Sequence, residues 1–293
     1  MIINSNSSTK EIKNGLYLVA TPIGNLDDIT IRALEVLKKS EYILCEDTRH
    51  TRKLLNHYGI KINKILSIHQ HNEKEKSEIL LKKIIADKAN IAYLTDAGTP
   101  CVSDPGSFLV NVARNLGIEV FSIPGPSSAV AAFAISGIVD GKFNFYGFLP
   151  NKKKNTEELL VKIKQEQHPA ILFESPNRVL ALLEAICDVI DPSTPIFVAR
   201  EMTKIYETHY SDSAENLCNF FKNNTKSLKG EFVIIINPLK SDDIEEFSHQ
   251  EIEMLGMLSE ELPLKKAANI VAKIFKKNKK DLYKVGLNNK NDK

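Results

Sequence analysis

The segment that decides the fold of this chain is Leu16-Tyr-Leu-Val-Ala-Thr-Pro-Ile-Gly-Asn-Leu-Asp-Asp28. Its apolar first part is typical of a buried strand, Thr21–Asn25 predicts a loop, and a helical pattern begins near Asp28. In α/β proteins such loops lie at the carboxyl edge of the sheet, where small ligands bind. The loop has neither G-x-G-x-x-G nor G-x-x-x-x-G-K-[ST], so it predicts neither a dinucleotide nor a nucleoside triphosphate site.

The alternation of strand and helix patterns continues through the first half of the chain. Strands are expected at 16–20, 42–45, 65–68, 91–95 and 120–123, and helices near 28–39, 48–57, 73–88 and 106–116. This order favours a mostly parallel sheet with helices on both faces. The alanine-rich run 127–136 predicts a further helix, with Ser127 or Ser128 as its N-cap.

A second α/β set follows, with shorter connections. Strands are expected at 143–148, 170–173, 195–199, 207–210 and 231–237, helices at 176–190 and 213–222, and a basic loop at 149–154. The closely spaced later strands predict a mixed sheet. Beyond an acidic linker at 238–249, a helix at 264–275, a turn at 277–279 and a short helix at 281–285 predict a helix-turn-helix-like extension.

The composition indicates a soluble protein of ordinary make-up. The chain has 293 residues, of which 26% are charged and 43% hydrophobic, with a formal net charge of +2. Residues 262–293 hold ten lysines against two aspartates, which predicts either a nucleic-acid contact or a solvated helix face. The four cysteines form no C-x-x-C pair, so neither a disulfide framework nor a zinc site is expected. No signal peptide or membrane-spanning run is evident, and we expect a cytoplasmic protein.

Several loops that follow predicted strands carry groups that can do chemistry. Glu46-Asp47-Thr48-Arg49 could supply a general base and a positioning cation, or Asp47 or Thr48 could simply cap the next helix. The loop 95–106 is Thr-Asp-Ala-Gly-Thr-Pro-Cys-Val-Ser-Asp-Pro-Gly, and its turn residues predict binding of a ligand by main-chain groups. Because it contains no lysine, a ligand with amide-like edges and a cation fits it better than a triphosphate. The segment Ile123-Pro-Gly-Pro-Ser-Ser128 is a weaker candidate for a ligand-binding loop.

Basic side chains in the second half could form a rim for a phosphate backbone. These are Arg178, Arg200, Lys204 and Lys229, although ordinary surface charge is an alternative for each of them. His71, in a His-x-His pattern after the strand at 65–68, is a candidate substrate contact; a metal site is not expected, because no third ligand lies nearby.

Taken in order, these motifs resemble the tetrapyrrole methylase superfamily of S-adenosylmethionine-dependent methyltransferases. The resemblance rests on Leu18–Thr30, Glu46–Thr51, Asp96–Gly106 and Pro124–Ser128, and it continues through Gly147–Pro150, Glu174–Arg178, Ala199–Lys204 and Lys229–Glu231. Within the superfamily the motifs most resemble the small-subunit (16S) ribosomal RNA (cytidine-2′-O)-methyltransferases. Cys101, Asn177 and the glycine-free turn at 276–279 depart from the family pattern.

The resemblance implies a class III methyltransferase fold with three parts. An N-terminal α/β domain at 15–128 and a C-terminal α/β domain at 129–240 would close on the methyl donor, followed by a basic helix-turn-helix-like extension at 250–293. The donor site would be lined by Pro22, Gly24, Asp96, Gly98, Thr99, Pro100, Ser127, Ser128 and Ala129. The expected partners are 16S rRNA or the small ribosomal subunit and, by family analogy, a second copy of the chain.

The implied reaction is transfer of a methyl group to a ribose 2′-hydroxyl of a cytidine. Such a hydroxyl needs a general base, for which Glu46 or Asp47 is expected, with Arg49 and Lys204 holding the flanking phosphates. One alternative is a methyltransferase of the same superfamily that acts on a corrinoid or a protein side chain. Another is a ribosome-assembly protein that binds the donor without turnover. A nicotinamide dehydrogenase is disfavoured because the glycine fingerprint is missing.

Overall fold

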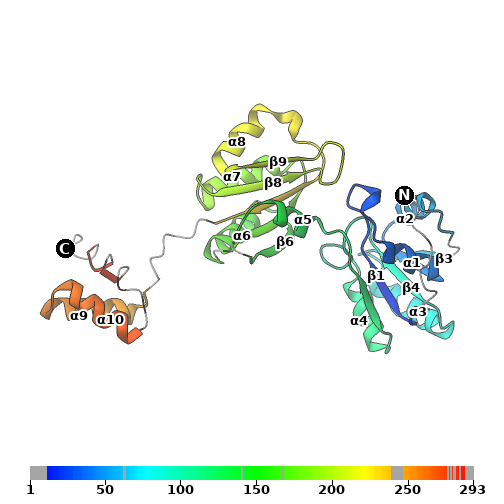
Figure 1. Cartoon of the computed structure of the whole chain (residues 1–293), viewed down its shortest axis with the longest axis horizontal. Coiled ribbons are helices and arrows are strands. Elements are labelled where there is room, and N and C mark those ends of the chain that lie inside the picture. The colour runs from blue at the N-terminus through cyan, green and yellow to red at the C-terminus, as the bar shows by residue number, and fades with distance from the viewer. Residues whose placement is uncertain are drawn as a thin grey trace. The chain divides into compact units, whose positions relative to one another are not determined.

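The computed structural model describes residues 12–61, 64–139, 141–166, 168–238 and 247–275, together with 277, 279, 282–283 and 285–287. The chain forms two compact units, Met1–Asn237 and Pro238–Lys293 (Figure 1). Within these described residues, no helix is both long and apolar enough to cross a membrane. The predicted division of the first unit near residue 128 stays a prediction.

The first sheet of the larger unit is entirely parallel, as predicted. Its strands are β1 (Leu16–Val19), β2 (Tyr42–Cys45), β3 (Lys64–Ser67), β4 (Ile91–Leu94) and β5 (Val120–Ile123), in the order β3-β2-β4-β1-β5. Strand β1 lies between β4 and β5, so the loop that follows it leaves the middle of the carboxyl edge. This is the place where ligands bind in open α/β sheets.

Helices cover both faces of this sheet because its strands are apolar on both sides. They are α1 (Ile31–Lys39), α2 (Thr48–His57), α3 (Glu73–Ala86) and α4 (Ser107–Asn115), and the short η1 (Leu26–Asp28) precedes α1 without contributing a buried residue. Alternate β1 residues enter different cores: Val19 packs with α1 and α2, and Leu16 with α3 and α4. The helix expected from residue 28 begins at Ile31 instead, because Thr30 is its N-cap and accepts a hydrogen bond from the backbone of Ala33.

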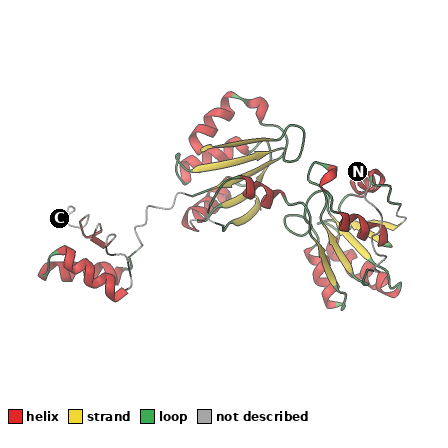
Figure 2. Cartoon of the chain, in the orientation of Figure 1, coloured by secondary structure: helices red, strands yellow, loops and turns green. Residues whose placement is uncertain are grey.

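The second sheet is mixed, also as predicted (Figure 2). Its strands are β6 (Asn144–Phe148), β7 (Ala170–Glu174), β8 (Pro195–Arg200), β9 (Thr208–Ser213) and β10 (Phe232–Ile236), in the order β6-β7-β10-β8-β9. Only the β6–β7 pair is parallel. Its helical elements are α5 (Ser128–Ile135), α6 (Lys153–Glu166), α7 (Val179–Val189), α8 (Ala214–Asn223) and η2 (Thr225–Ser227). Helices α6, α7 and α8 share one core with this sheet and α5 packs on its other face.

Two helices were not predicted. Helix α6 begins at Lys153, inside the expected basic loop 149–154, and only Leu160 and Ile163 are buried along it, which leaves a weak apolar pattern. Helix α9 (His249–Glu261) begins at the end of the expected linker. Its capping box, Ser248 with Glu251, was a readable sequence signal.

The smaller unit has its own apolar core. Helix α9 packs on α10 (Leu264–Phe275), which confirms the helix predicted there. The core contains Leu255, Ala267, Val271 and Leu282. The predicted turn at 277–279 and helix at 281–285 lie partly outside the described residues.

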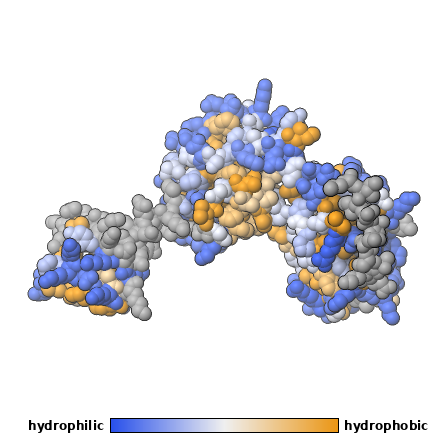
Figure 3. Space-filling model, in the orientation of Figure 1, coloured by the Kyte–Doolittle hydropathy of each residue, from blue (hydrophilic) through white to orange (hydrophobic). Residues whose placement is uncertain are grey.

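The larger unit also carries exposed apolar side chains. Figure 3 shows apolar residues gathered over the part of the surface formed by α5 and β6. Val130, Val139 and Phe143 are exposed there or close to it in sequence. An exposed apolar face of this kind is typical of a surface that contacts another molecule.

Candidate active site

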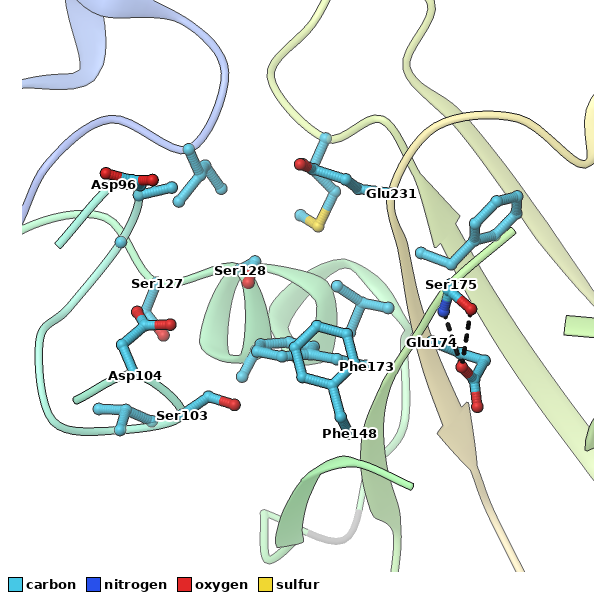
Figure 4. Close-up of a pocket in the computed structure, with 18 of the residues that line it drawn as sticks. Asp96, Ser103, Asp104, Ser127, Ser128, Phe148, Phe173, Glu174, Ser175 and Glu231 are labelled. Carbon is cyan, nitrogen blue, oxygen red and sulfur yellow. Dashed lines mark hydrogen bonds between the residues drawn. The ribbon is translucent and has the colours of Figure 1, made fainter. Parts of the chain in front are cut away.

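A cavity of about 410 Å³ lies within the larger unit, lined by loops from both of its sheets. Figure 4 shows Asp96, Asp104 and Ser127 on one side, with Phe173, Ser175 and Glu231 across from them. The predicted donor residues that line it are Asp96, Gly98, Thr99, Ser127, Ser128 and Ala129. Predicted donor residues Pro22 and Gly24 line a second, adjoining cavity instead, and Pro100 lines neither cavity.

Main-chain hydrogen bonds hold the first-sheet loops of the cavity together. The backbone N–H of Thr21 donates to the carbonyl of Gly98 over 2.9 Å, and the N–H of Gly98 donates back over 3.0 Å. The Thr99 hydroxyl donates to the carbonyl of Pro126 over 3.0 Å. Gly98 has a φ of +77°, a left-handed conformation that glycine adopts without strain. The loops after β1, β4 and β5 therefore form one connected wall.

The lining of this cavity fits S-adenosylmethionine. Four acidic residues line it, namely Asp96, Asp104, Glu174 and Glu231, and among the described residues no lysine, arginine or histidine does so. This charge suits a ligand with a sulfonium and an ammonium group and disfavours a triphosphate. Phe148 and Phe173 lie edge to face with their ring centroids 5.6 Å apart and supply an apolar wall for a flat base.

The loop after β1 also contacts the loop between β8 and β9. The backbone N–H of Asn25 donates to the hydroxyl of Thr203 over 3.0 Å. A Cβ atom on Gly24 would lie 2.6 Å from Cγ of Lys204, closer than a real contact allows. Gly24 is therefore required because the two loops approach each other so closely.

Three carboxylates gather beside the cavity. Glu46, Asp96 and Asp104 lie close enough for their charges to interact. Burial raises the pKa of Glu46, and the charges of Asp96 and Asp104 raise it further. Burial likewise raises the pKa of both Asp96 and Asp104. A carboxylate with a raised pKa is a stronger base.

Asp47 has a different environment from Glu46. It is the N-cap of α2 and accepts a hydrogen bond from the backbone N–H of Arg49 over 2.7 Å. The Arg49 guanidinium also donates to its carboxylate over 2.7 Å, and these hydrogen bonds hold the pKa of Asp47 well below its usual range. Asp47 is thus the capping residue of this motif, whereas Glu46, with its raised pKa, is the candidate for the base.

Three of the predicted RNA-contacting cations are held by protein oxygens. Lys204 donates to Glu201 over 2.7 Å and to Glu231 over 2.9 Å. The Arg200 guanidinium donates to the carbonyl of Lys229 over 2.6 Å. These contacts brace the loops that border the cavity. RNA contact by these side chains stays a prediction.

Arg178 is held most extensively. Its guanidinium donates to the carbonyl of Pro150 over 2.8 Å and to Asn151 Oδ1 over 2.7 Å, and it lies 3.4 Å from the buried carboxylate of Glu174. It therefore ties the loop after β6, which directly follows the cavity residue Phe148, to the loop after β7.

We expect Arg178→Met to destabilise the protein by about 2 kcal/mol, because Glu174 would lose its cation and the loop carbonyls their donor. Chemical denaturation measures this directly. The matched control is Lys226→Met, which removes an exposed cation of η2. An Arg178→Met protein as stable as this control would contradict the bracing role.

The other predicted RNA contacts lie at the surface. His71 and Lys229 are exposed, and the backbone N–H of His71 donates to His69 Nδ1 over 3.3 Å. Sequence reasoning did not single out the cavity residues Phe148 and Phe173. Each lies at or next to the end of a strand before a proline-containing turn, which was an available signal.

Comparisons with known proteins agree with this geometry. Residues 15–218 match the family described as Tetrapyrrole (Corrin/Porphyrin) Methylases, and residues 245–290 match the RsmI C-terminal HTH domain. Ribosomal RNA small subunit methyltransferase I of Haemophilus influenzae is 45% identical over 93% of this chain and 96% of its own length. The protein of the same name from Escherichia coli O157:H7 is 41% identical over 97% of this chain and 99% of its own length.

Solved structures share the fold at low sequence identity. Diphthine synthase aligns with a TM-score of 0.59 at 15% identity, over 76% of this chain and 89% of its own. Uroporphyrin-III-C-methyltransferase from Thermus thermophilus aligns with a TM-score of 0.52 at 18% identity, over 77% of this chain and 95% of its own. On the family match and the near-full-length relatives, the chain belongs to the tetrapyrrole methylase family of S-adenosylmethionine-dependent methyltransferases and, within it, to the family of ribosomal RNA small subunit methyltransferase I.

Proposed function

We propose that this protein transfers a methyl group to the ribose 2′-hydroxyl of a cytidine in 16S ribosomal RNA. The observation that carries the proposal is the near-full-length similarity to ribosomal RNA small subunit methyltransferases. The acidic cavity built from the predicted donor loops supports it, because it suits a cationic methyl donor.

The chemistry requires alignment and one proton transfer. S-adenosylmethionine, when bound, supplies a methyl group on a positively charged sulfur. Asp96, Gly98 and Ser127 would hold the donor in the cavity, so that the acceptor oxygen approaches in line with the carbon–sulfur bond. Glu46 would take the proton of the hydroxyl, since burial and the charge of Asp96, which lines both cavities, raise its pKa.

The remaining predicted residues have supporting roles in this proposal. Asp47 caps α2 and orients Arg49, whose guanidinium would bind a flanking phosphate. Lys204 keeps the loop after β8 in place through Glu201 and Glu231. His71 and Lys229 remain exposed candidates for contact with RNA.

The test incubates the protein with radiolabelled S-adenosylmethionine and small ribosomal subunits that lack rRNA methylation. The RNA is then hydrolysed with alkali, which leaves the phosphodiester bond next to a 2′-O-methylated ribose intact. Label in an alkali-resistant dinucleotide that begins with 2′-O-methylcytidine is the expected result. Label on a base would refute the choice of acceptor atom, and no label in RNA would favour a corrinoid or protein substrate or an assembly role without turnover.

The proposed base predicts the pH dependence of the reaction. The base must be ionised, so single-turnover transfer at saturating donor falls as the pH drops through the raised pKa of Glu46. Asp104→Asn removes one of the charges that raise this pKa, so the acidic limb should move to lower pH. Asp188→Asn, on the exposed surface of α7, is the control and should leave the limb in place. A limb that stays fixed in Asp104→Asn, or moves to higher pH, would contradict the assignment.

The predicted homodimer and the role of the extension also belong to this proposal. The exposed apolar residues of the α5–β6 surface could be covered by a second copy, and sedimentation at micromolar concentration tests this. Residues 245–290 match an HTH domain, which supports RNA contact by the basic extension. Salt-dependent RNA binding that is unchanged on removal of residues 245–293 would rule this out.

A further inference from the structure

A second cavity of about 420 Å³ adjoins the donor cavity. Its walls come from the loop after β1, the end of β4 and helix α2. The two cavities have Ile23, Asp96 and Ala97 in common, so they meet at the loop after β4. A group held in the second cavity would therefore lie beside the methyl donor.

Helix α2 turns one basic face toward this cavity. His50, Lys53, Leu54 and His57 line it, at the spacing i, i+3, i+4 and i+7 that places side chains on one face of a helix. Leu55 of the same helix is buried in the core between α2 and the sheet. The helix is therefore anchored by its apolar side while its basic side chains face the cavity.

Within the described residues, Lys53 and His57 are not held by protein oxygens in the way that Arg178, Arg200 and Lys204 are. Lys53 is exposed, and in the described part of the chain no hydrogen bond or ion pair engages its ammonium group. The ring of His57 packs edge to face against the ring of Tyr58, with centroids 4.8 Å apart. His50 Nδ1 lies 3.6 Å from Asp96 Oδ2, at the junction of the cavities.

The charges of the two cavities are complementary. Among the described residues, Asp96 is the only acidic side chain that lines the second cavity, and the remaining wall is largely apolar or uncharged, with Pro22, Ile23 and Leu94. In the described part of the chain, the donor cavity is lined by four acidic side chains and by no basic one. A cationic donor and an anionic acceptor would thus be drawn to different sides of Asp96.

We propose that the second cavity binds the sugar–phosphate backbone of the acceptor RNA, with Lys53 and His57 on the phosphates that flank the target ribose. This inference rests on the proposed function, since it names the place where the acceptor of that reaction binds. The apolar wall accommodates the sugar and base, and the contact with Asp96 directs the ribose toward the donor. Phosphate contacts of this kind fix position without reading sequence.

The test measures binding of a fluorescein-labelled single-stranded oligocytidylate to the full-length protein over a range of salt concentrations. Lys53→Gln should weaken binding at low salt about 5- to 10-fold and lower the salt slope by roughly 0.7, the value for one lost contact on a single strand. Lys53→Gln with His57→Gln should weaken it further, and Lys53→Arg should restore the slope.

The matched control is Arg52→Gln, which removes an exposed cation from the same helix but from outside the cavity. It should change binding less than twofold. Equal binding and equal slopes for Lys53→Gln and Arg52→Gln would overturn the inference, as would an absence of salt-dependent binding by the unaltered protein. Transfer of labelled methyl groups by that unaltered protein to unmethylated small subunits reports separately on the proposed function.

Discussion

Glu46→Gln should lower the single-turnover rate of methyl transfer by about 10²- to 10⁴-fold, the contribution expected of a general base. The amide keeps the size of the side chain, but it carries no charge and cannot take a proton at the pH of the reaction. Donor affinity should stay within a few-fold of the unaltered protein, because Glu46 lines neither cavity. Quenched-flow transfer at saturating donor and RNA measures the rate.

Asp47→Asn is the matched control for this substitution. Asparagine is as good an N-cap as aspartate, so α2 should keep its start, and the loss is confined to the ion pair with Arg49. We expect a rate within about tenfold of the unaltered protein. The assignment of the base to Glu46 fails if Asp47→Asn loses as much activity, or if alanine at both positions leaves the rate within a few-fold.

Gly98→Val should weaken S-adenosylmethionine binding about 100-fold. A β-branched residue at a φ of +77° is strained by roughly 1–2 kcal/mol, and its Cβ would already lie 3.5 Å from Cγ2 of Ile23. Further methyl groups crowd a residue that lines the donor cavity. The loop can relieve this only by breaking its paired hydrogen bonds with Thr21, which changes the wall of the cavity. Isothermal titration calorimetry measures the affinity.

Gly117→Val is the control that separates backbone strain from a direct effect on donor binding. Gly117 has a nearly identical φ of +74°, follows helix α4, and a Cβ there would have nothing within 4 Å. Its substitution should lower the free energy of unfolding to a similar degree while leaving donor affinity unchanged. If both variants lose affinity equally, the loss comes from general destabilisation and Gly98 has no special place in the donor site.

The correct and missed helices show what local pattern can reveal. Helix α2 was predicted with both ends correct because Asp47 is a strong capping signal and its buried residues follow the helical period. Helix α6 was missed because only two buried apolar positions, Leu160 and Ile163, mark its core face. Where one face of a helix is mostly polar, the pattern alone resembles a solvated loop.

The loops of the site could be predicted from the sequence, but the partners of their charged side chains could not. Turn residues after β1, β4 and β5 marked the wall around Gly98, because turn chemistry is local. Whether Arg178 faces a ligand or Glu174 depends on how two loops meet in space. The same is true of the different environments of Glu46 and Asp47, which are neighbours in the chain.

The sequence was sufficient to predict the two α/β sheets, their parallel and mixed character, and the loops after β1, β4 and β5 whose residues line the first cavity. These features follow from apolar periodicity and turn residues, which act over a few positions along the chain. Only the tertiary structure decided which cations are already bound, which carboxylate keeps a raised pKa, and that a basic face of α2 adjoins an acidic cavity. Burial and electrostatic interaction depend on distances between segments that the order of residues does not encode locally.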